Sequence, residues 1–459
     1  MEWQNYQKVL LPDIPNYHQI DVYRKHGGYE MFRQVVTSAD WNPRKVIDTV
    51  KAANIRGRGG AGFNAGLKWS FMPPKQPGVP RYLACNGDES EPGTCKDRRL
   101  FEFNPHLFLE GVLIACYAME MDAAYVYIRG EYADWIDMMQ KAVDDAYAAG
   151  LIGKNLFGSD FSTEVYVHKG AGAYICGEET SLMESLEGKR AYPRSKPPFP
   201  AQAGLWGKPT TINNIETLAN VPLVLKNGVE WFTQMGAPDH PGPVLYGISG
   251  HVNKPGVYEY PTGMLLTDLI YKVGGGIRGG KKIKAVVPGG VSVPILRADE
   301  ALPPFAQDGR YSQYGHMMGG FLNKDANGKL FSIEGVTMNA KSLGEAGTAL
   351  GTAGMLVLDE NTDMVKFLHR VERFYDHESC GQCTPCREGT GWLRKLVYKF
   401  VISEATSRDM DLLLDLCENM EGRTVCALAD AAAWPTRASI LRFRDEFEAR
   451  VRKTVFAVA

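Results

Sequence analysis

The sequence predicts a multidomain α/β protein that ends in a helical bundle, and three observations lead to this fold class. Strand and helix patterns alternate from about residue 56 to 238, short β segments with glycine turns follow from about 240, and helical spacing of apolar residues prevails after 360. Such alternation is typical of a layered α/β domain, and consecutive helices are typical of a bundle. A chain of 459 residues is long enough for two to four domains.

The N-terminal and α/β regions can be assigned segment by segment. The first 55 residues carry short helical patterns, the clearest at PRKVIDTVKAANI. We then expect strands at RYLACN, AAYVYIRG and STEVYVHKG, with helices at HLFLEGVLIACYAMEM, YADWIDMMQKAVDDAYAAG and ETSLMESLEG. A proline-rich stretch, YPRSKPPFPAQAGLWGKP, lies inside this region, and we expect it to be an ordered binding loop rather than a linker.

In the remainder of the chain the predicted secondary structure changes twice. GPVLYGISGHV, KPGVYEYP and IKAVVPGG predict strands around one helix, LLTDLIYKVGG, which indicates a small α+β domain. Four helices are expected after residue 360, the last at PTRASILRFRDEFEARVRKTV. The predicted division is a helical segment (1–55), an α/β domain (56–238), a small sheet domain (239–335) and a helical bundle (336–459).

Composition excludes several classes of function. The net charge of −2 and a pI near 6.5 give no basic field for nucleic acid or anionic lipid. The N-terminus does not resemble a secretory signal, and the longest apolar run is interrupted by Glu110, so we expect no direct membrane insertion. Nine cysteines, five of them after residue 379, fit a reducing compartment better than a disulfide scaffold.

The cysteines after residue 379 give the strongest chemical signal. Cys380, Cys383 and Cys386 form a Cys-x-x-Cys-x-x-Cys run, which allows one loop to bind three corners of a cubane iron–sulfur cluster. Cys417 falls on a helical apolar pattern and is expected to be a packing residue. Cys426 follows a glycine that should end a helix, so we choose it as the fourth ligand. Zinc is the alternative, although it usually takes two separated cysteine pairs.

A glycine loop in NIRGRGGAGFNAGLKWSF suggests a phosphate site. Its G-x-G-x-x-G follows a helical pattern rather than a strand, which is the wrong context for a dinucleotide fingerprint. Arg58 and Lys68 nevertheless bracket glycines whose backbone N–H groups can approach a phosphate. Phe63, Trp69 and Phe71 supply aromatic faces, so the stretch indicates a nucleotide or flavin, with a flexible turn as the alternative.

Three further stretches carry polar groups next to expected strands. YLACNGDESEPGTCKDR places acidic residues after a strand, where they could bind sugar hydroxyls or simply form a solvated turn. VHKGAGAYICGEETSLMESLEG places glycines between a strand and a helix, with Tyr174 available to stack on a ring and two acids that could simply cap the helix. TTINNIET contains paired amides, which alone would more often form a turn or cap.

Together, five stretches resemble the NADH-binding flavoprotein subunit of respiratory complex I, the NADH:quinone oxidoreductase. They are GRGGAGF, DESEPGT with KDR one residue later, GAGAYICGEET, TINNIET and ESCGQCTPCREG, and they follow one another in the family's order over nearly the whole chain. The resemblance implies a Rossmann-like FMN/NADH domain, a ubiquitin-like β-grasp (SLBB-like) domain and a C-terminal four-helix bundle that carries a 4Fe–4S cluster.

The resemblance also implies site residues. Those expected to hold FMN are Gly57, Arg58, Gly59, Lys68, Asn86, Asp88, Glu89, Ser90, Gly177, Glu178, Asn213 and Asn214. Those expected to line the NADH side are Phe63, Phe71, Glu91, Tyr174, Glu179, Lys196 and Phe199. Those expected to bind the cluster are Cys380, Cys383, Cys386 and Cys426. No protein acid or base is expected, because hydride would pass directly from NADH to FMN.

The implied activity is NADH oxidation, with electrons passed one at a time to the cluster and then, through partners, to quinone. Expected partners are a thioredoxin-like 2Fe–2S subunit and the large iron–sulfur subunit of complex I. The expected location is the cytoplasmic face of the bacterial inner membrane, or the mitochondrial matrix side. The alternatives are a diaphorase subunit of a soluble NAD-linked hydrogenase or formate dehydrogenase, and a non-catalytic scaffold with a structural metal site.

Overall fold

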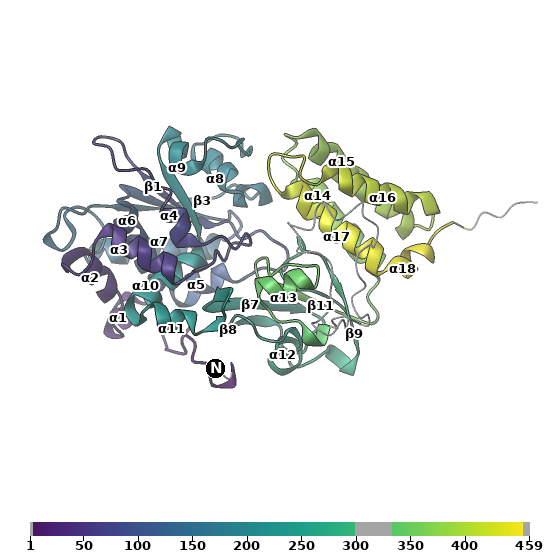
Figure 1. The fold of residues 1–459 in the computed structure, drawn as a ribbon, viewed down its shortest axis with the longest axis horizontal. Helices are drawn as coiled ribbons and strands as arrows, with labels where there is room; N and C mark the ends of the chain where they lie inside the picture. Colours follow the sequence, from purple (N-terminus) through teal and green to yellow (C-terminus); the bar gives the residue numbers. More distant parts are fainter. Residues whose placement is uncertain (1–2, 299–332, 453–459) are drawn as a thin grey trace, which may run out of the picture.

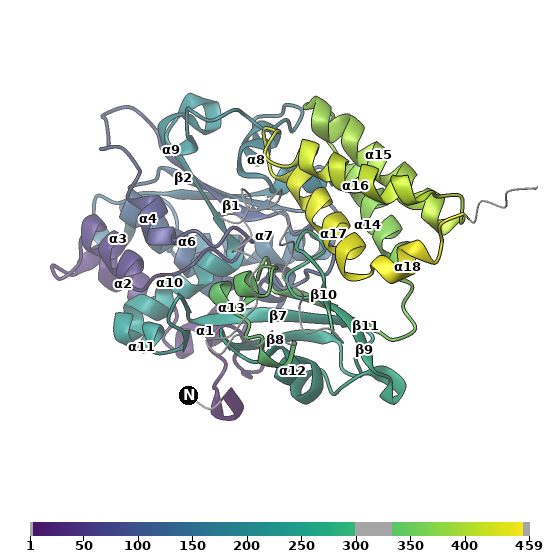
Figure 2. The same ribbon diagram turned by 45° about the vertical axis from the view of Figure 1, so that its right-hand side comes forward.

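A computed structural model describes residues 3–298 and 333–452, which form a sheet-and-helix region, a second sheet and a group of helices (Figure 1). Among these residues, no helix is long and apolar enough to cross a membrane. The helical group, drawn in yellow-green, lies beside both sheets in each view (Figure 2).

The first region is built on a four-stranded parallel sheet. Its strands, in the spatial order β3-β2-β1-β4, are Glu164–Lys169, Ala123–Ile128, Tyr82–Gly87 and Thr210–Asn214. Because all four run in the same direction, their carboxyl ends meet at one edge, where Asn86 stands opposite Asn214. Polar residues at these strand ends can therefore converge, which is the usual position of a ligand site in an open α/β sheet.

Alternate residues of the strands enter two separate cores. Leu83 and Cys85 of β1 pack on one side with α6 (Pro105–Met119), α7 (Ala133–Ala148) and α10 (Ile215–Asn227). Ala84 faces the other side and packs with α8 (Glu179–Leu186). Both faces of the sheet are thus covered, as apolar strands in a parallel sheet require.

The expected strands and helices of this region are present. The other helices from the N-terminus to residue 233 are α1 (Ile20–Lys25), α2 (Glu30–Thr37), α3 (Pro43–Ala52), α4 (Ala65–Trp69), α5 (Asp97–Phe103), α9 (Pro200–Ala203) and α11 (Val229–Thr233). Short 3-10 turns lie at Trp3–Asn5, Leu156–Gly158, Tyr174–Gly177, Leu205–Gly207, Arg278–Gly280 and Ile333–Gly335. A two-stranded ribbon, β5 (Gly236–Ala237) and β6 (His240–Pro241), leads to the second sheet.

The second sheet has five strands in the order β10-β9-β11-β7-β8. Their bounds are Leu296–Arg297, Ile283–Val287, Gly354–Asp359, Pro243–Gly250 and Gly256–Pro261. α12 (Leu266–Asp268) continues as a π-helical turn at Leu269–Val273, and α13 (Ala340–Glu345) packs into the same core.

One strand of this sheet differs from the sequence prediction. β11 lies in the segment that the sequence assigns to the helical bundle, yet it pairs in parallel with β7 and antiparallel with β9 at the centre of the sheet. The predicted boundary at residue 336 therefore divides elements that share one sheet. Such long-range pairing leaves no local trace in the sequence.

The helical group consists of α14 (Met364–Glu378), α15 (Thr384–Val401), α16 (Ser407–Met420) and α17 (Leu428–Arg442), which enclose a common core, with the short α18 (Arg444–Glu448) after them. The last helix is predicted to begin at Pro435. That start is wrong: α17 begins at Leu428 and contains Pro435, because the alanine-rich turn before the proline favours helix. The predicted continuous helix also breaks at Phe443.

Candidate functional site

A cavity of about 920 Å³ opens at the carboxyl edge of the parallel sheet. It brings together most of the residues predicted to bind a nucleotide, although they come from distant parts of the chain. Those that line it are Gly57, Gly59, Phe63, Lys68, Phe71, Asn86, Gly177, Glu178, Glu179, Lys196, Phe199, Asn213 and Asn214. The proline-rich stretch therefore forms part of an ordered wall, as expected.

The glycine loop comes so close to β4 that side chains would obstruct it. A Cβ atom on Gly59 would lie 3.2 Å from Cβ of Asn214, and one on Gly57 would lie 3.3 Å from the carbonyl oxygen of Phe63. Gly62 has φ +64°, a conformation that favours glycine. The N–H groups of Gly57 and Arg58 donate to the Phe63 carbonyl oxygen and to Thr217 Oγ1, both at 2.8 Å, and so hold the loop in place. The part of the loop from Gly59 onward can approach a phosphate or flavin with its main chain.

Two lysines converge on one carboxylate at the mouth of the cavity. Nζ of Lys68 lies 2.8 Å from Glu179, and Nζ of Lys196 lies 2.5 Å from the same side chain. Burial would raise the pKa of Glu179, but the two ammonium groups outweigh it and lower the pKa to about 2. Glu178 lies 3.7 Å from Nζ of Lys196, so two carboxylates balance the two ammonium groups, and a phosphate-bearing ligand would have to compete with them for the lysines.

Aromatic side chains stand exposed beside this trio. The ring centroids of Phe63 and Phe71 are 6.2 Å apart, and both rings leave about half their surface in solvent. Phe199 is similarly exposed. Exposed aromatic faces around a polar cavity are suited to stacking on a planar ring.

A buried charge network lies behind the floor of the cavity. The Asn214 amide donates to Asp97 at 2.7 Å, and Nζ of Lys96 lies 2.8 Å from both Asp97 and Glu216. Lys96 and both acids are almost completely buried. The sequence alone suggests no role for these three residues; their place inside the KDR and TINNIET motifs was the signal that could have pointed to them.

Some predicted residues have side chains that point away from the cavity. The Arg58 guanidinium is buried and donates to the carbonyl oxygen of Pro241 at 2.8 Å. The Glu89 carboxylate accepts backbone N–H groups of Lys96 and Asp97 at the start of α5, at 2.7 and 2.8 Å. These side chains support the loops, and neither residue lines the cavity.

Asp88 and Ser90 form a pair behind the wall at Gly177. Ser90 Oγ donates to one Asp88 oxygen at 2.6 Å, while the other oxygen is buried with no partner among the described residues. Burial raises the pKa of Asp88 to about 7. The Asn86 amide donates to the carbonyl oxygen of Gly177 at 2.8 Å and so ties this strand end to the wall.

Glu91 and Tyr174 lie on the side of the site that faces the helical group. The Tyr174 hydroxyl and the Ser292 backbone N–H donate to Glu91 at 2.7 and 2.8 Å. Burial raises the pKa of Glu91 in spite of these bonds. Tyr174 also donates its backbone N–H to Glu378 at 2.9 Å, and its ring lies 5.1 Å from that of Phe374.

Four of the nine free thiols gather where α14, α15 and α17 meet. Cys380 and Cys383 lie between α14 and α15, Cys386 is in the first turn of α15, and Cys426 is in the loop before α17. Burial raises the pKa of Cys386 to about 11, with Cys380 and Cys383 adding to the effect. Burial likewise raises the pKa of Cys426 to about 12, and Cys386 and Cys380 again contribute. Cys417 is buried on α16 in the apolar core, as expected.

The arrangement of the thiols bears on the kind of metal site. Across residues 3–298 and 333–452, no three His, Cys, Asp or Glu side chains converge on a position that would hold one metal ion. A cluster with iron atoms at separate corners needs its four sulfurs further apart than a single ion does. The finding therefore concerns a single-ion zinc site and leaves the cluster hypothesis unaffected.

Comparison with known proteins identifies the family. A model of the Nuo51 FMN-binding domain matches residues 50–223, an SLBB domain model matches 245–296, and the NADH-ubiquinone oxidoreductase-F iron–sulfur binding region matches 366–450. The F subunit of NADH-quinone oxidoreductase from Rickettsia typhi is 48% identical over 89% of each chain. This chain belongs to the family of NADH-quinone oxidoreductase F subunits. The family member from Rhodobacter capsulatus is 47% identical over 90% of this chain and 88% of its own.

Family membership confirms the expected activity, NADH oxidation, and the expected cofactors, FMN and a 4Fe–4S cluster. It also confirms a mixed α/β fold with a parallel sheet, an SLBB domain and an iron–sulfur region. Among solved structures, an NAD+-reducing NiFe hydrogenase in its H2-reduced state matches 94% of this chain with a TM-score of 0.76 and 32% identity. This chain spans 65% of the length of that hydrogenase chain.

Proposed function

We propose that the 920 Å³ cavity is where this chain binds FMN and NADH together. The observation that carries the proposal is the convergence in one cavity of the glycine loop, two lysines, the strand-end asparagines and three exposed phenylalanines. The glycine loop and Lys68 would hold the FMN phosphate, and Asn213 and Asn214 would bind polar edges of the flavin. Phe63, Phe71 and Phe199 would line the NADH side.

FMN, when bound, supplies the chemistry that accepts a hydride as two electrons and passes them on singly. The chain's own residues supply alignment and charge. Trp69 donates to Asn213 at 2.8 Å and Asp97 holds the amide of Asn214, so both asparagines are fixed before a ligand arrives. Preorganised groups of this kind raise the rate by keeping reacting atoms in place. The Lys68–Glu179–Lys196 trio would orient the charged parts of NADH at the entrance.

We further propose that Cys380, Cys383, Cys386 and Cys426 bind the 4Fe–4S cluster. Their gathering at the junction of three helices supports this assignment. The connection from β3 to α8 supports a short path between the two centres: Ile175 packs in the core of the helical group, Cys176 in that of the sheet, and Gly177 lines the cavity. This segment therefore connects the two proposed sites.

The finer assignments follow the family. We propose that the chain works in complex I with a thioredoxin-like 2Fe–2S subunit and the large iron–sulfur subunit, at the cytoplasmic face of the bacterial inner membrane or the mitochondrial matrix side. The four predicted domains are kept, with the boundary moved between β11 and α14 so that the five-stranded sheet stays whole. The hydrogenase neighbour supports a second candidate, the diaphorase subunit of a soluble NAD-linked hydrogenase.

Rapid mixing with NADH tests the proposed sequence of events. Flavin absorbance should bleach first, and the reduced-cluster signal in electron paramagnetic resonance should follow. With FMN added in excess, Cys426→Ala should still show flavin bleaching but lose the cluster signal and most of the iron, which should be about four atoms per chain in the unaltered protein. The matched variant Cys417→Ala removes a buried thiol from α16 and should keep both. Full iron content in Cys426→Ala would refute the ligand assignment.

A further inference from the structure

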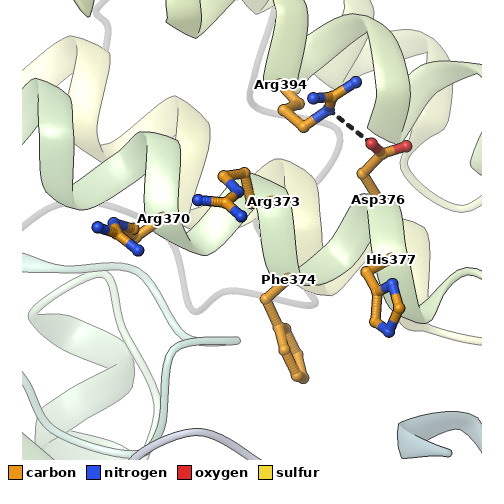
Figure 3. A pocket seen from close by; sticks show the side chains of 6 residues that line it. All are labelled: Arg370, Arg373, Phe374, Asp376, His377 and Arg394. Carbon is orange, nitrogen blue, oxygen red and sulfur yellow. Dashed lines mark ion pairs between the residues drawn. The ribbon is translucent and has the colours of Figure 1, made fainter.

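A second cavity, of about 660 Å³, lies beside α14 and α15. It is lined by Arg370, Arg373, Phe374, Asp376, His377 and Arg394. Figure 3 shows Arg370 and Arg373 on α14, with Phe374 and His377 projecting from the following turn and Arg394 reaching across from α15. We refer to these six residues as the arginine cavity. One of the six, Phe374, also packs its ring against Tyr174, which is expected on the NADH side.

The arginine cavity carries unbalanced positive charge. Arg394 is neutralised by Asp376, at 2.6 Å, and His377 lies 3.9 Å from Glu378. Arg370 and Arg373 are exposed and make no ion pair with any residue in the described ranges 3–298 and 333–452. Two neighbouring guanidinium groups without counter-ions repel each other. An anion bound between them would remove this electrostatic repulsion.

A neighbouring histidine reports the same field. Burial lowers the pKa of His369, and Arg373, Arg394 and Arg370 lower it further. The three guanidinium groups are therefore close enough to act on the same side chain.

The position of the arginine cavity connects it with electron exit. α14 ends at Glu378, two residues before Cys380, and Arg394 lies eight residues after Cys386 on α15. Electrons that reach the proposed cluster one at a time must leave the chain through a protein that comes close to these cysteines. The cavity therefore flanks the place where such an acceptor would dock.

We propose that the arginine cavity is a docking site for an acidic surface of the partner protein that takes electrons from the cluster, with carboxylates of that partner paired to Arg370 and Arg373. The inference rests on the proposed cluster site. Arginine suits this role because its planar fork binds a carboxylate through two hydrogen bonds and is weakly hydrated.

The surroundings favour a protein over a free anion. Phe374 forms part of the lining together with the three arginines. Arginine and aromatic side chains are both enriched in protein–protein interfaces. An acidic partner would be steered toward this surface, and its association would weaken as salt shortens the range of the attraction.

The test compares charge-reversed variants in the intact native assembly. Arg370→Glu with Arg373→Glu should lower NADH-to-quinone electron transfer in membranes, and recovery of the chain with the purified assembly, by about tenfold or more. NADH oxidation with ferricyanide, a small one-electron acceptor, should stay within about twofold of the unaltered chain, because docking is not needed there. Arg370→Lys with Arg373→Lys keeps the charge and should restore most of the transfer at low salt.

The control is Arg278→Glu, an exposed arginine on the second sheet domain, which should leave all three readouts unchanged. Normal assembly and quinone reduction in the doubly reversed variant would overturn the proposal, and so would an equal loss in the control. If inorganic phosphate bound to the unaltered chain but assembly were indifferent to the reversal, the cavity would be a free-anion site and the proposal would also fall. Failure of the proposed function itself would show separately, as loss of the cluster signal in the unaltered chain.

Discussion

Glu372 on α14 provides a quantitative test of the packing around the proposed cluster. Its side chain is completely buried; one oxygen accepts from Thr436 Oγ1 at 2.7 Å, and the other has no partner among the described residues. Burial raises the pKa of Glu372 from 4.5 to about 8. The substitution Glu372→Gln keeps the shape of this side chain and removes its ability to ionise.

The sign and size of the effect follow from the two pKa values. Below pH 4.5 the carboxyl group is protonated in both states, so the native state has its full stability. Between pH 4.5 and about 8 only the unfolded chain releases the proton, so the free energy of unfolding falls as pH rises. At about 1.36 kcal/mol per pH unit, the total loss is about 5 kcal/mol. The glutamine variant avoids this loss.

Urea unfolding of the full chain at pH 5, 6, 7 and 8 measures the difference. Far-UV circular dichroism follows the whole molecule, and cluster absorbance follows the helical group. The stability of Glu372→Gln relative to the unaltered chain should increase by several kcal/mol from pH 5 to pH 8, while other acids titrate in both proteins and cancel. Glu404→Gln, at an exposed position, should show no such trend. A difference independent of pH would refute the reasoning about Glu372.

Three further predictions concern other parts of the chain. Gly111→Ala should lower the free energy of unfolding in urea by about 3 kcal/mol, because the added Cβ would overlap the backbone oxygen of Leu218 where α6 crosses α10. Gly344→Ala, where the added Cβ has free space, should change it little. Equal stabilities of the two variants would contradict the packing argument. Lys96→Met should cost about 3–5 kcal/mol by leaving two buried carboxylates unpaired, and wild-type urea stability would refute this. The Glu259 carboxylate accepts hydrogen bonds from backbone N–H groups of the N-terminal segment, so Glu259→Ala should make this segment sensitive to limited proteolysis. An unchanged digestion pattern would show that Glu259 does not anchor the segment.

The sequence could predict much of the site because glycine and cysteine spacing carries local information. The helical spacing around Cys417 and the glycine before Cys426 predicted that the first would be buried in a helix and the second would lie in a loop, and the structure places them so. The sequence does not predict in which direction a side chain points. Glu89 lies among residues predicted to hold FMN, yet its carboxylate caps α5, because that choice depends on where the next helix begins.

The sequence also could not predict which distant strands pair with each other. Thr210 and Thr211 stand in the TTINNIET stretch, but they line the cavity because β4 pairs with β1 across more than a hundred residues, and the stretch itself does not indicate that pairing. β11 was assigned to the wrong region for the same reason. Local patterns predict elements, whereas the partner of a strand is decided by the whole chain.

The segment Tyr174–Gly177 couples the helical group, where the cluster would be inserted, to the sheet region, where the flavin would bind. One of its residues packs into the helical group, the next into the sheet core and the third into the cavity wall. A newly made chain without iron would have a loosened helical junction, and the loosening would reach the flavin pocket through three consecutive residues. Such a chain would hold its flavin poorly, and immature chains would consume little NADH before they had anywhere to send its electrons.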